Sequence, residues 1–389
     1  MIEGSEGTGG IRLTYGMVGG GQGAFIGDVH RKAIALDGLA KIKAGCFSQE
    51  YENTLATGKA LGLDKERCYK TYLEMMEAEG KREDKIDFVI IVTPNSSHFS
   101  IAKAAIEKGI HVVCDKPLTT NISEAEELAG MAKKKGLLFC VTYAYAGYPI
   151  VKHIRDFIAG GGLGDLRFVD AEYIQDWLAT PLEETGQKQS LWRTDPHLAG
   201  GSNCVGDIGT HIEHMVFYMT GLRINRLCAR LDRTIPDRVL DDNASILVEY
   251  ENGARGIYWS SQIAVGNDNG FRIRIFGSKA SIEWHQENPN YVKVGHVDKP
   301  TEWISRGRDD LSPLAQSFSR IPSGHPEGYF EAFANIYVSF ITALAKTKAG
   351  QEPAGRDRDY PGIDEGIAGV RFIEKCVESS GQGAVWVDY

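Results

Sequence analysis

An aspartate and a histidine, Asp207 and His211, stand four positions apart in the chain. If this segment is helical, the two side chains share one face, and the carboxylate can then orient the imidazole and raise its basicity. Such a pair suits the removal of a proton from a hydroxyl group, although an ion pair on a helix surface has the same spacing. Zinc binding is disfavoured, because no third ligand follows at helical spacing.

A glycine-rich segment follows the first apolar run, and Gly19, Gly21 and Ala24 fit the pattern G-x-G-x-x-G/A. Glycines between a strand and a helix let backbone N–H groups approach a pyrophosphate at the N-terminus of the helix. A purely structural turn is the alternative, but a preceding strand and a following helix are the context that the motif requires. We therefore expect a dinucleotide site at this loop.

Lys116 lies between Asp115 and Pro117, directly after an apolar run over residues 111–114. The carboxyl ends of the strands are where an open α/β sheet binds its ligand. A lysine at this edge can hold a substrate hydroxyl by a hydrogen bond, and a solvated surface lysine is the alternative. The segment from Thr93 to His98 follows the preceding apolar run, so it would border a bound nicotinamide at the same edge.

The second strand should end in an acidic residue that binds the adenosine ribose, but Ser48 occupies this place. No Arg or Lys follows immediately to attract a 2′-phosphate, and Glu50 would repel one, so the sequence favours NAD without excluding NADP. Ser48 can also be the N-cap of the next helix. The expected cofactor-binding residues are Gly19, Gly21, Gln22, Gly23, Ala24, Phe25, Ile26, Ser48, Thr93, Pro94, Asn95, His98, Asp115 and Lys116.

The apolar residues follow two different patterns along the chain, and these patterns predict the strands and helices that position the side chains named above. Short apolar runs, typical of buried strands, occur at residues 13–20, 42–47, 86–93, 111–114 and 137–143, and a clear helix is expected over residues 123–135. This alternation predicts a parallel sheet covered by helices on both faces. Later strands are expected at residues 167–177, 244–251, 256–262, 271–276, 280–285 and 291–297.

The later strands are joined by short turns, which indicates an antiparallel sheet. Asn252 and Gly253 predict a two-residue type I′ hairpin, and residues 277–279 predict a second hairpin. Helices are expected over residues 330–344, where an aromatic stripe would pack on this sheet, and over residues 363–379. The fold class is therefore an α/β Rossmann dinucleotide-binding domain followed by an α+β domain with a large, mostly antiparallel open sheet.

The domain boundaries follow from the same change of rhythm. We expect a flexible lead at residues 1–10, the Rossmann domain at residues 11–146 and a substrate-binding and oligomerisation domain at residues 147–389, whose C-terminal helix can pack back on the first domain. The 389 residues carry 43 basic and 52 acidic side chains, a net charge of −9, which disfavours nucleic acid as a partner. No apolar run approaches the roughly 20 residues of a membrane span. The N-terminus does not resemble a secretion signal, and the seven cysteines include no CxxC pair, so we expect a cytoplasmic protein with reduced thiols.

The order of these motifs resembles the glucose–fructose oxidoreductase, inositol dehydrogenase and MocA (Gfo/Idh/MocA) family. The resemblance covers residues 11–389, with one conservative departure: Asp115 stands where the family usually has a glutamate before the lysine. It implies that Lys116, Asp207 and His211 are catalytic, that His211 is the general base for a sugar hydroxyl, and that Lys116 holds this hydroxyl near the nicotinamide. It further implies a homo-oligomer, a dimer or tetramer, that forms through the open sheet face.

A second departure concerns the substrate. Family members often have an arginine near the start of the second domain, where this chain has a neutral, tyrosine-rich segment over residues 143–148. Aromatic faces pack on sugar C–H surfaces and phenol groups bind hydroxyls, so an uncharged carbohydrate is expected, although core packing would also account for these rings. The expected substrate-binding residues are Tyr143, Tyr145, Tyr148, Gln175, Trp177, Trp192, Arg193 and His325.

These expectations combine into hydride transfer between NAD and a secondary hydroxyl of a neutral sugar, glycoside or cyclic polyol. A more specific form is oxidation at C3 of a glucoside to give a 3-keto sugar. Two alternatives stay open: an NAD-dependent glycosidase that oxidises C3 transiently and eliminates the aglycone, and a dinucleotide-binding regulator without catalysis.

Overall fold

Two sheets, one in each of two units, organise the residues that this computed structural model describes, which are residues 12–389. The expected flexible lead at residues 1–10 lies outside them. The first unit comprises the described residues up to Thr119 with Ser123–Gly147 and Tyr329–Ile367, and the second comprises Thr120–Ile122, Tyr148–Gly328 and Ala368–Tyr389. Residues 147–389 are expected from the sequence to form one domain, whereas residues 329–367 belong to the first unit in the structure.

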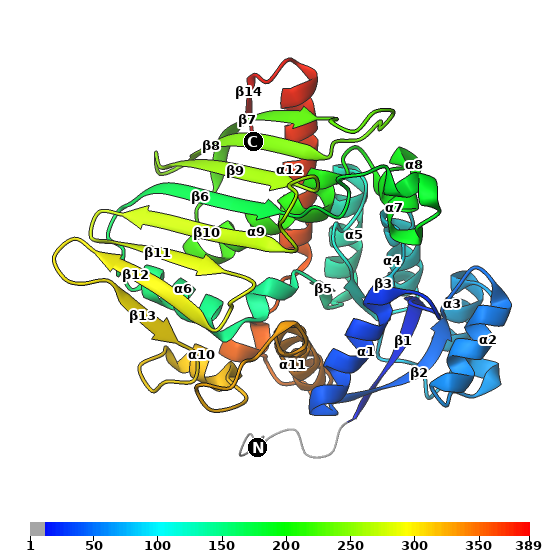
Figure 1. Cartoon of the computed structure of the whole chain (residues 1–389). Coiled ribbons are helices and arrows are strands. Elements are labelled where there is room, and N and C mark those ends of the chain that lie inside the picture. The colour runs from blue at the N-terminus through cyan, green and yellow to red at the C-terminus, as the bar shows by residue number, and fades with distance from the viewer. Residues whose placement is uncertain (1–11) are drawn as a thin grey trace. The chain divides into compact units, whose positions relative to one another are not determined.

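The first unit contains a five-stranded parallel sheet in the order β2-β1-β3-β4-β5 (Figure 1). Its strands are β1 (Leu13–Gly19), β2 (Ala40–Cys46), β3 (Phe88–Val92), β4 (His111–Cys114) and β5 (Phe139–Val141). Its helices are α1 (Phe25–Asp37), α2 (Tyr51–Ala60), α3 (Tyr72–Lys81), α4 (His98–Glu107), α5 (Ile122–Lys135) and α11 (Tyr329–Lys348). The predicted parallel sheet is confirmed, and every residue of its central strand β3 is buried.

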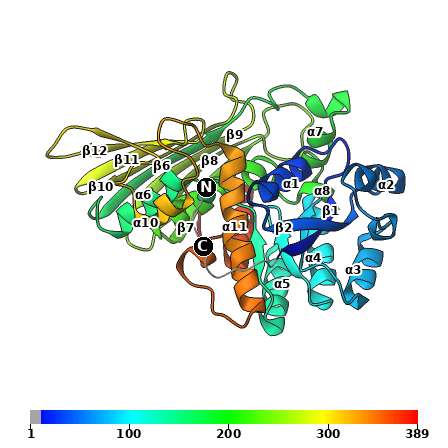
Figure 2. The ribbon, with the colours of Figure 1, turned by 90° about the horizontal axis from the view of Figure 1, so that it is seen from below.

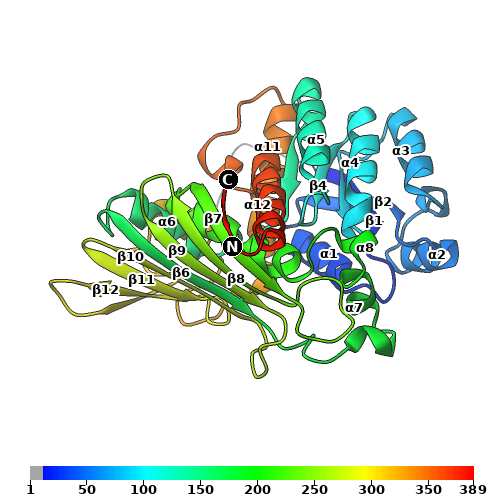
Figure 3. The ribbon, with the colours of Figure 1, turned by 90° about the horizontal axis from the view of Figure 1, so that it is seen from above.

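Helices cover both faces of this sheet, as the sequence predicted. Helices α3, α4 and α5 lie on one face, and α1 and α11 lie side by side on the other (Figures 2 and 3). The ring of Phe340 on α11 packs edge-on against Phe88 of β3, with 5.4 Å between the ring centroids. The aromatic stripe is therefore core, but it packs in the first unit rather than on the antiparallel sheet, and Phe330 is 39% exposed.

The second unit contains a nine-stranded sheet in the order β13-β12-β11-β10-β6-β9-β8-β7-β14. Its strands are β6 (Leu166–Ile174), β7 (Ile224–Asp232), β8 (Asn243–Tyr250), β9 (Arg255–Ser261), β10 (Gly270–Gly277), β11 (Ala280–His285), β12 (Tyr291–His296), β13 (Glu302–Ser305) and β14 (Trp386–Asp388). Only β6 and β9 pair in parallel, so the predicted antiparallel character is confirmed. Strands β7, β13 and β14 were not predicted from the sequence.

Helices cover one face of this second sheet, and the other face carries none within residues 12–389 (Figures 1 and 3). Phe372 on α12 packs against Tyr258 of β9 at 6.1 Å between ring centroids. The helices of the second unit are α6 (Pro149–Ala159), α7 (Lys188–Arg193), α8 (Pro196–Ala199), α9 (Thr210–Thr220) and α10 (Pro313–Phe318). Helix α12 (Ile363–Gly381) begins in the first unit and continues in the second.

The turn between β8 and β9 differs from the predicted type I′ hairpin. The backbone N–H of Tyr250 donates to the carbonyl of Ala254 at 2.9 Å, so three residues rather than two connect the strands. Of these three residues, Gly253 has a positive φ of 86°. A type I turn completed by a left-handed glycine is the common three-residue solution, and the Asn-Gly pair therefore predicted the hairpin correctly and its turn type wrongly.

Among residues 12–389, none of the helices combines the length and the hydropathy that a bilayer crossing needs. The seven cysteines are free, and all but the half-buried Cys228 are buried. No group of three His, Cys, Asp or Glu side chains within the described residues is arranged to hold a metal ion.

Candidate active site

The glycine loop joins β1 to α1 with a backbone that larger residues rarely adopt. Gly19, Gly20 and Gly23 have φ values of 86°, 72° and 83°. A Cβ atom on Gly19 would lie 2.6 Å from the carbonyl oxygen of Val92, the last residue of β3. The loop can therefore pass close to the neighbouring strand only because this position has no side chain.

Helix α2 holds the loop through contacts that the sequence analysis did not identify. The N–H of Gln22 lies 3.0 Å from Oδ1 of Asn53 and 3.1 Å from Oγ1 of Thr57, and Nδ2 of Asn53 donates to the carbonyl of Gln22 at 3.2 Å. The N–H of Gly21 donates to the carbonyl of Phe47 at 3.0 Å. These two loop amides thus already have partners within the protein.

The N-terminus of α1 is the part of the loop that suits a phosphate. Its N-cap residue, Ala24, has no side chain that could accept a hydrogen bond from the first turn. Uncapped N–H groups at a helix N-terminus bind anions, and the helix dipole favours negative charge there. Of the predicted cofactor residues in this loop, Gly23, Phe25 and Ile26 are therefore best placed for a pyrophosphate.

Ser48 follows β2 and is a turn residue. Its Oγ accepts a hydrogen bond from the N–H of Glu50 at 3.2 Å. Glu50, not Ser48, is the N-cap of α2, so the alternative interpretation as an N-cap is wrong by two positions. No acidic side chain follows directly at the end of β2, and the side chains of Asn53 and Thr57 on α2 contact the glycine loop at Gln22.

His98 connects the two segments that follow β3 and β4. Its side chain is fully buried at the start of α4, with Nδ1 2.9 Å from the carbonyl of Pro117 and Nε2 2.8 Å from the carbonyl of Thr93. Burial lowers the pKa of His98 below its ordinary value. The predicted residues Thr93, Pro94, Asn95 and His98 thus lie together with Asp115 and Lys116, both half-buried, at the carboxyl edge of the sheet.

The tyrosine-rich segment is buried. Tyr143 and Tyr145 belong to the first unit, where the ring centroid of Tyr145 lies 6.0 Å from that of Tyr329. Tyr148 belongs to the second unit, and its hydroxyl accepts from Nε2 of Gln286 at 3.3 Å. The burial agrees with the packing interpretation of these rings, and a contact with substrate stays a prediction.

Asp207 lies in a π-helical turn, Val205–Gly209, that continues directly into α9. The N–H of Thr210 bonds to the carbonyl of Val205, five residues earlier. Such turns inside helices are rare and are frequent at functional sites. The helical geometry expected for Asp207 and His211 is thus present, and its widened first turn is a feature that the sequence analysis did not predict.

Two side chains hold the same oxygen of Asp207. Nε2 of Gln262 donates to Oδ2 at 2.9 Å, and Nε of Arg193 lies 3.2 Å from Oδ2. Gln262 is fully buried, and its Oε1 accepts from Nδ2 of Asn203 at 2.8 Å, which fixes the orientation of its amide. Asn203 in turn donates from its backbone N–H to Oδ1 of the buried Asp241 at 3.0 Å.

Gln262 should therefore matter for both activity and stability. We expect Gln262→Leu to lower kcat by about 10-fold to 100-fold, because misplacement of a positioned group by 1 Å costs up to about 100-fold. Stability should fall by about 1–3 kcal/mol, because Asn203 loses an acceptor in a buried site. Steady-state kinetics and thermal unfolding check this, with the exposed Gln316→Leu as the matched control. A Gln262→Leu enzyme with wild-type kcat would contradict the positioning role.

The guanidinium of Arg193 lies over two indole rings. Its guanidinium carbon lies 4.3 Å from the ring centroid of Trp192 and 5.8 Å from that of Trp177. Nη1 donates to Oε1 of Gln189 at 2.6 Å. Three of the predicted substrate residues, Arg193, Trp192 and Trp177, thus lie together in the second unit, and the positive charge of Arg193 is balanced by the carboxylate of Asp207.

Asn269, which the sequence analysis missed, connects the remaining polar residues. Its Oδ1 accepts from Nε2 of Gln175 and from the hydroxyl of Tyr173, both at 2.7 Å. Trp177 donates from Nε1 to Oε1 of Gln175 at 3.1 Å. The ring centroid of Tyr173 lies 6.0 Å from that of the buried His211. The pairing of strands β6 and β10 brings Gln175 and Asn269 together. No local sequence signal could therefore have identified Asn269.

His325 lies on an exposed loop before α11. The loop is fixed by the buried ion pair between Nη1 of Arg306 and Oε1 of Glu327, at 2.7 Å, and the carbonyl of His325 accepts from the same guanidinium. His214, one turn beyond His211, is buried, and burial lowers its pKa to about 3, which makes it a neutral core residue.

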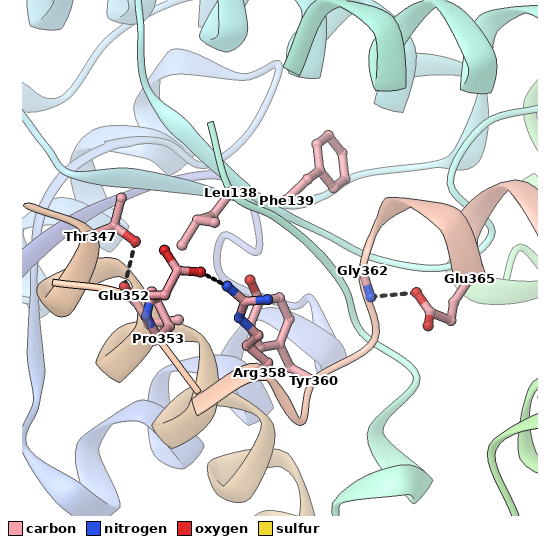
Figure 4. Close-up of a pocket in the computed structure, with 10 residues that line it drawn as sticks. Leu138, Phe139, Thr347, Glu352, Pro353, Arg358, Tyr360, Gly362 and Glu365 are labelled. Atoms are coloured by element: carbon pink, nitrogen blue, oxygen red, sulfur yellow. Dashed lines mark hydrogen bonds and ion pairs between the residues drawn. The ribbon is translucent and has the colours of Figure 1, made fainter. Parts of the chain in front are cut away.

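A pocket of about 470 Å³ lies elsewhere in the first unit, beside the start of β5 (Figure 4). Leu138 and Phe139 line it from the amino end of β5, and Arg358 and Glu365 face it from the segment after α11. Open α/β sheets bind their ligands at the carboxyl ends of the strands. This pocket contains none of the predicted site residues, and we assign no part of the site to it.

Comparison with known proteins identifies both halves of the chain. Residues 13–143 match the model of an oxidoreductase family with an NAD-binding Rossmann fold, and residues 151–283 match that of the GFO/IDH/MocA C-terminal domain. The chain is 40% identical to the uncharacterized oxidoreductase YfiI of Bacillus subtilis, over 97% of each chain. It is 27% identical to levoglucosan dehydrogenase of Pseudarthrobacter phenanthrenivorans, over 72% of this chain and 76% of that protein.

Solved structures of similar oxidoreductases resemble this chain over nearly its whole length. An inositol dehydrogenase homologue from Azotobacter vinelandii in complex with NAD+ superposes with a TM-score of 0.94 at 39% identity, covering 98% of both chains. Its complex with NADH and myo-inositol gives a TM-score of 0.92 at 38% identity with the same coverage. The predicted fold class, the oxidoreductase class and the NAD-binding fold are thereby confirmed, and the chain belongs to the GFO/IDH/MocA family of oxidoreductases.

Proposed function

We propose that the protein is a dehydrogenase that transfers a hydride between a secondary hydroxyl of a neutral cyclic polyol, sugar or glycoside and NAD. The observation that carries the proposal is the support of Asp207: a buried amide and a stacked guanidinium hold one of its oxygens, one helical turn before His211. A surface ion pair would not need a buried glutamine behind it. The myo-inositol complex of the Azotobacter vinelandii homologue favours a cyclic polyol.

NAD fits the first unit because the glycine loop leaves the N-terminus of α1 uncapped. Gly23, Phe25 and Ile26 would hold its pyrophosphate, and the segment from Thr93 to Asn95 would border its nicotinamide. When bound, NAD supplies the hydride acceptor, and the protein has to align the two transfers.

In the proposed mechanism, His211 takes the proton of the reacting hydroxyl as general base. Asp207 orients the imidazole and stabilises its charged form. Lys116 donates a hydrogen bond to the oxygen of the same hydroxyl, which favours the alkoxide character that develops as the hydride leaves. The proposal requires that these three side chains meet at one substrate.

The charges around Asp207 support a neutral substrate. Arg193 is paired with Asp207, so its charge is balanced before a substrate arrives. The groups beside it are amides, phenols and indoles, including Gln175, Asn269 and Trp177. Such groups bind hydroxyls and pack on C–H faces, whereas a phosphate or carboxylate would need an uncompensated cation.

The test is product analysis with purified protein, NAD, and myo-inositol, levoglucosan or a methyl glucoside as the substrate. A dehydrogenase gives a ketone and one NADH per substrate oxidised, and NMR of the product locates the new carbonyl, which decides on C3 oxidation of a glucoside. Release of the aglycone without net NADH would instead establish the glycosidase alternative. Binding of NAD without turnover of any of these compounds would establish the regulator.

We also propose that two copies associate through the open face of the nine-stranded sheet. Leu247 and Ile257 are directly opposite each other on β8 and β9, with 45% and 44% of their surfaces exposed. The charged residues on the same face are paired across strands, for example Arg272 with Glu172 at 2.8 Å. An apolar patch with balanced charges on an uncovered sheet face suits burial against a second copy.

Ile257→Glu should therefore dissociate the oligomer into monomers, because it places a charge at the centre of a face that is buried in the assembly. Light scattering coupled to gel filtration at low-micromolar concentration measures the change. Leu73→Glu is the matched control, because Leu73 is 60% exposed on α3 in the first unit. A wild-type protein that is already a monomer at this concentration would refute the proposed interface.

A further inference from the structure

Two buried histidines hold the residues on either side of Lys116. On one side, Nε2 of His30 lies 3.0 Å from Oδ1 of Asp115. On the other side, Nδ1 of His98 lies 2.9 Å from the carbonyl of Pro117. Both histidine side chains are fully buried, and they come from different helices, α1 and α4.

The orientation of His30 is fixed by α11. Its Nδ1 lies 2.5 Å from the hydroxyl of Tyr337, and its ring packs edge-on against Phe333 at 4.7 Å between centroids. Burial raises the pKa of Tyr337 well above its ordinary value, so the phenol keeps its proton, and it shares a hydrogen bond with Nδ1 of His30. Because a carboxylate only accepts hydrogen bonds, Nε2 of His30 carries the proton that is donated to Oδ1 of Asp115.

Asp115 is therefore held as a carboxylate. Its Oδ1 also accepts from Oγ1 of Thr142 at 2.5 Å, and its backbone N–H donates to the carbonyl of Ile91 at 3.0 Å. Burial alone would raise the pKa of Asp115, but His30 and Thr142 outweigh that effect and the pKa lies below its ordinary value. Tyr337, His30 and Thr142 are all buried in the first unit, whereas Asp115 is half-buried.

We propose that His30 and His98 are positioning residues that together fix the backbone of Lys116, and we call the pair the two-histidine clamp. The proposal rests on the proposed function, in which Lys116 holds the reacting hydroxyl. A buried polar network is costly unless all its members are satisfied, and replacing a buried ion pair by apolar residues is often neutral or stabilising. The clamp explains why the network is present: it sets the position of Lys116 relative to the glycine loop, because the loop leads directly into α1, which carries His30.

The clamp is tested by His30→Leu and His98→Leu. Each should lower kcat with NAD and the best polyol by about 10-fold to 100-fold, since small displacements of a catalytic group have effects of this size. In His30→Leu, KM for NAD should change by less than about threefold. The double variant should be little worse than either single one, because both act on the same lysine. His30→Gln should recover most of the loss, because its amide can accept from Tyr337 and donate to Asp115 at once.

A matched control separates positioning from folding. His153 is buried in the second unit, where its Nδ1 accepts from the N–H of Ser312 at 3.0 Å. His153→Leu should lower the thermal unfolding temperature by a similar amount and leave kcat unchanged. If the His30 and His98 variants lose stability like this control and keep the wild-type kcat, the clamp is refuted and the two histidines are only core residues.

A second readout does not depend on turnover. The rate at which Lys116 is acetylated by an N-hydroxysuccinimide ester, measured by mass spectrometry of the full chain without substrate, should change more than about threefold in both clamp variants and stay constant in His153→Leu. An unchanged rate in the clamp variants would overturn the inference. If the wild-type protein turns over no alcohol, the proposed function fails, and this labelling experiment still decides the clamp.

Discussion

Lys116→Ala and His211→Ala should each lower kcat/KM for the polyol substrate by about 100-fold to 10,000-fold, the usual contribution of a positioned proton-transfer group. This corresponds to about 3–5 kcal/mol of transition-state stabilisation. NAD affinity should change much less than kcat/KM, because neither side chain belongs to the glycine loop, where the pyrophosphate is expected. If both groups act on one hydroxyl, the loss of kcat/KM in the double variant should be far smaller than the product of the losses in the two single variants. Stopped-flow and steady-state measurements of NADH formation provide the rates.

The controls for this experiment separate charge from position. Lys134→Ala removes an exposed lysine from α5 and should leave the rate unchanged. Lys116→Arg keeps the charge but changes the shape of the donor, so a large loss in this variant would indicate that the position of the ammonium matters. Unchanged turnover in the Lys116→Ala, His211→Ala double variant would show that the assigned roles are wrong.

Gly27→Ala should weaken NAD binding by at least about 10-fold and destabilise the first unit by about 1–3 kcal/mol, the usual cost of overpacking. A Cβ atom on Gly27 would lie 2.4 Å from Cα of Gly20 and 3.0 Å from its carbonyl oxygen. These are backbone atoms, so the loop and the first turn of α1 must move apart. Since the N-terminus of α1 is the expected phosphate site, the displacement affects the cofactor directly. Isothermal titration with NAD and thermal unfolding measure both effects.

Gly130→Ala is the matched control for Gly27→Ala, because both glycines lie in helices and helix propensity favours alanine by about 1 kcal/mol. Gly130 is exposed on α5, and no atom lies within 4 Å of the Cβ that alanine would add. This variant should be slightly more stable than the wild type and bind NAD normally. A Gly27→Ala protein that behaves like Gly130→Ala would mean that the close approach of α1 to the loop is not needed.

Local patterns predicted the sheet strands of the first unit because their signals lie within a few residues. The run over residues 86–93 is fully apolar, as a strand buried on both faces must be, and β3 occupies Phe88–Val92. Strand β7 was missed because Ile224–Asp232 contains Asn225, Arg226 and Arg230, which leave no continuous apolar run. Its residues face solvent on one side and α12 on the other, and this context is not visible in the sequence of the strand itself.

Residues that support the site were missed for a different reason. Asn53, Gln262, Asn269 and His30 have no motif, and each acts through a partner distant in the chain, such as His30 and Tyr337, which are 307 residues apart. Hydrogen bonds of this kind depend on which strands pair and how helices pack on them. Neither strand pairing nor helix packing can be inferred from the spacing of these residues along the chain.

The sequence by itself determined the alternation of strands and helices in the Rossmann half, the glycine loop and the identity of Lys116, Asp207 and His211 as candidates, because glycine conformations, apolar periodicity and helical spacing are properties of a few neighbouring residues. Tertiary structure alone decided that α11 packs with the first unit, that β6 and β9 pair in parallel, and that buried amides and histidines fix Asp207 and the neighbours of Lys116. A buried polar group must find its partner wherever the folded chain provides one, and that choice is made by packing across the whole unit.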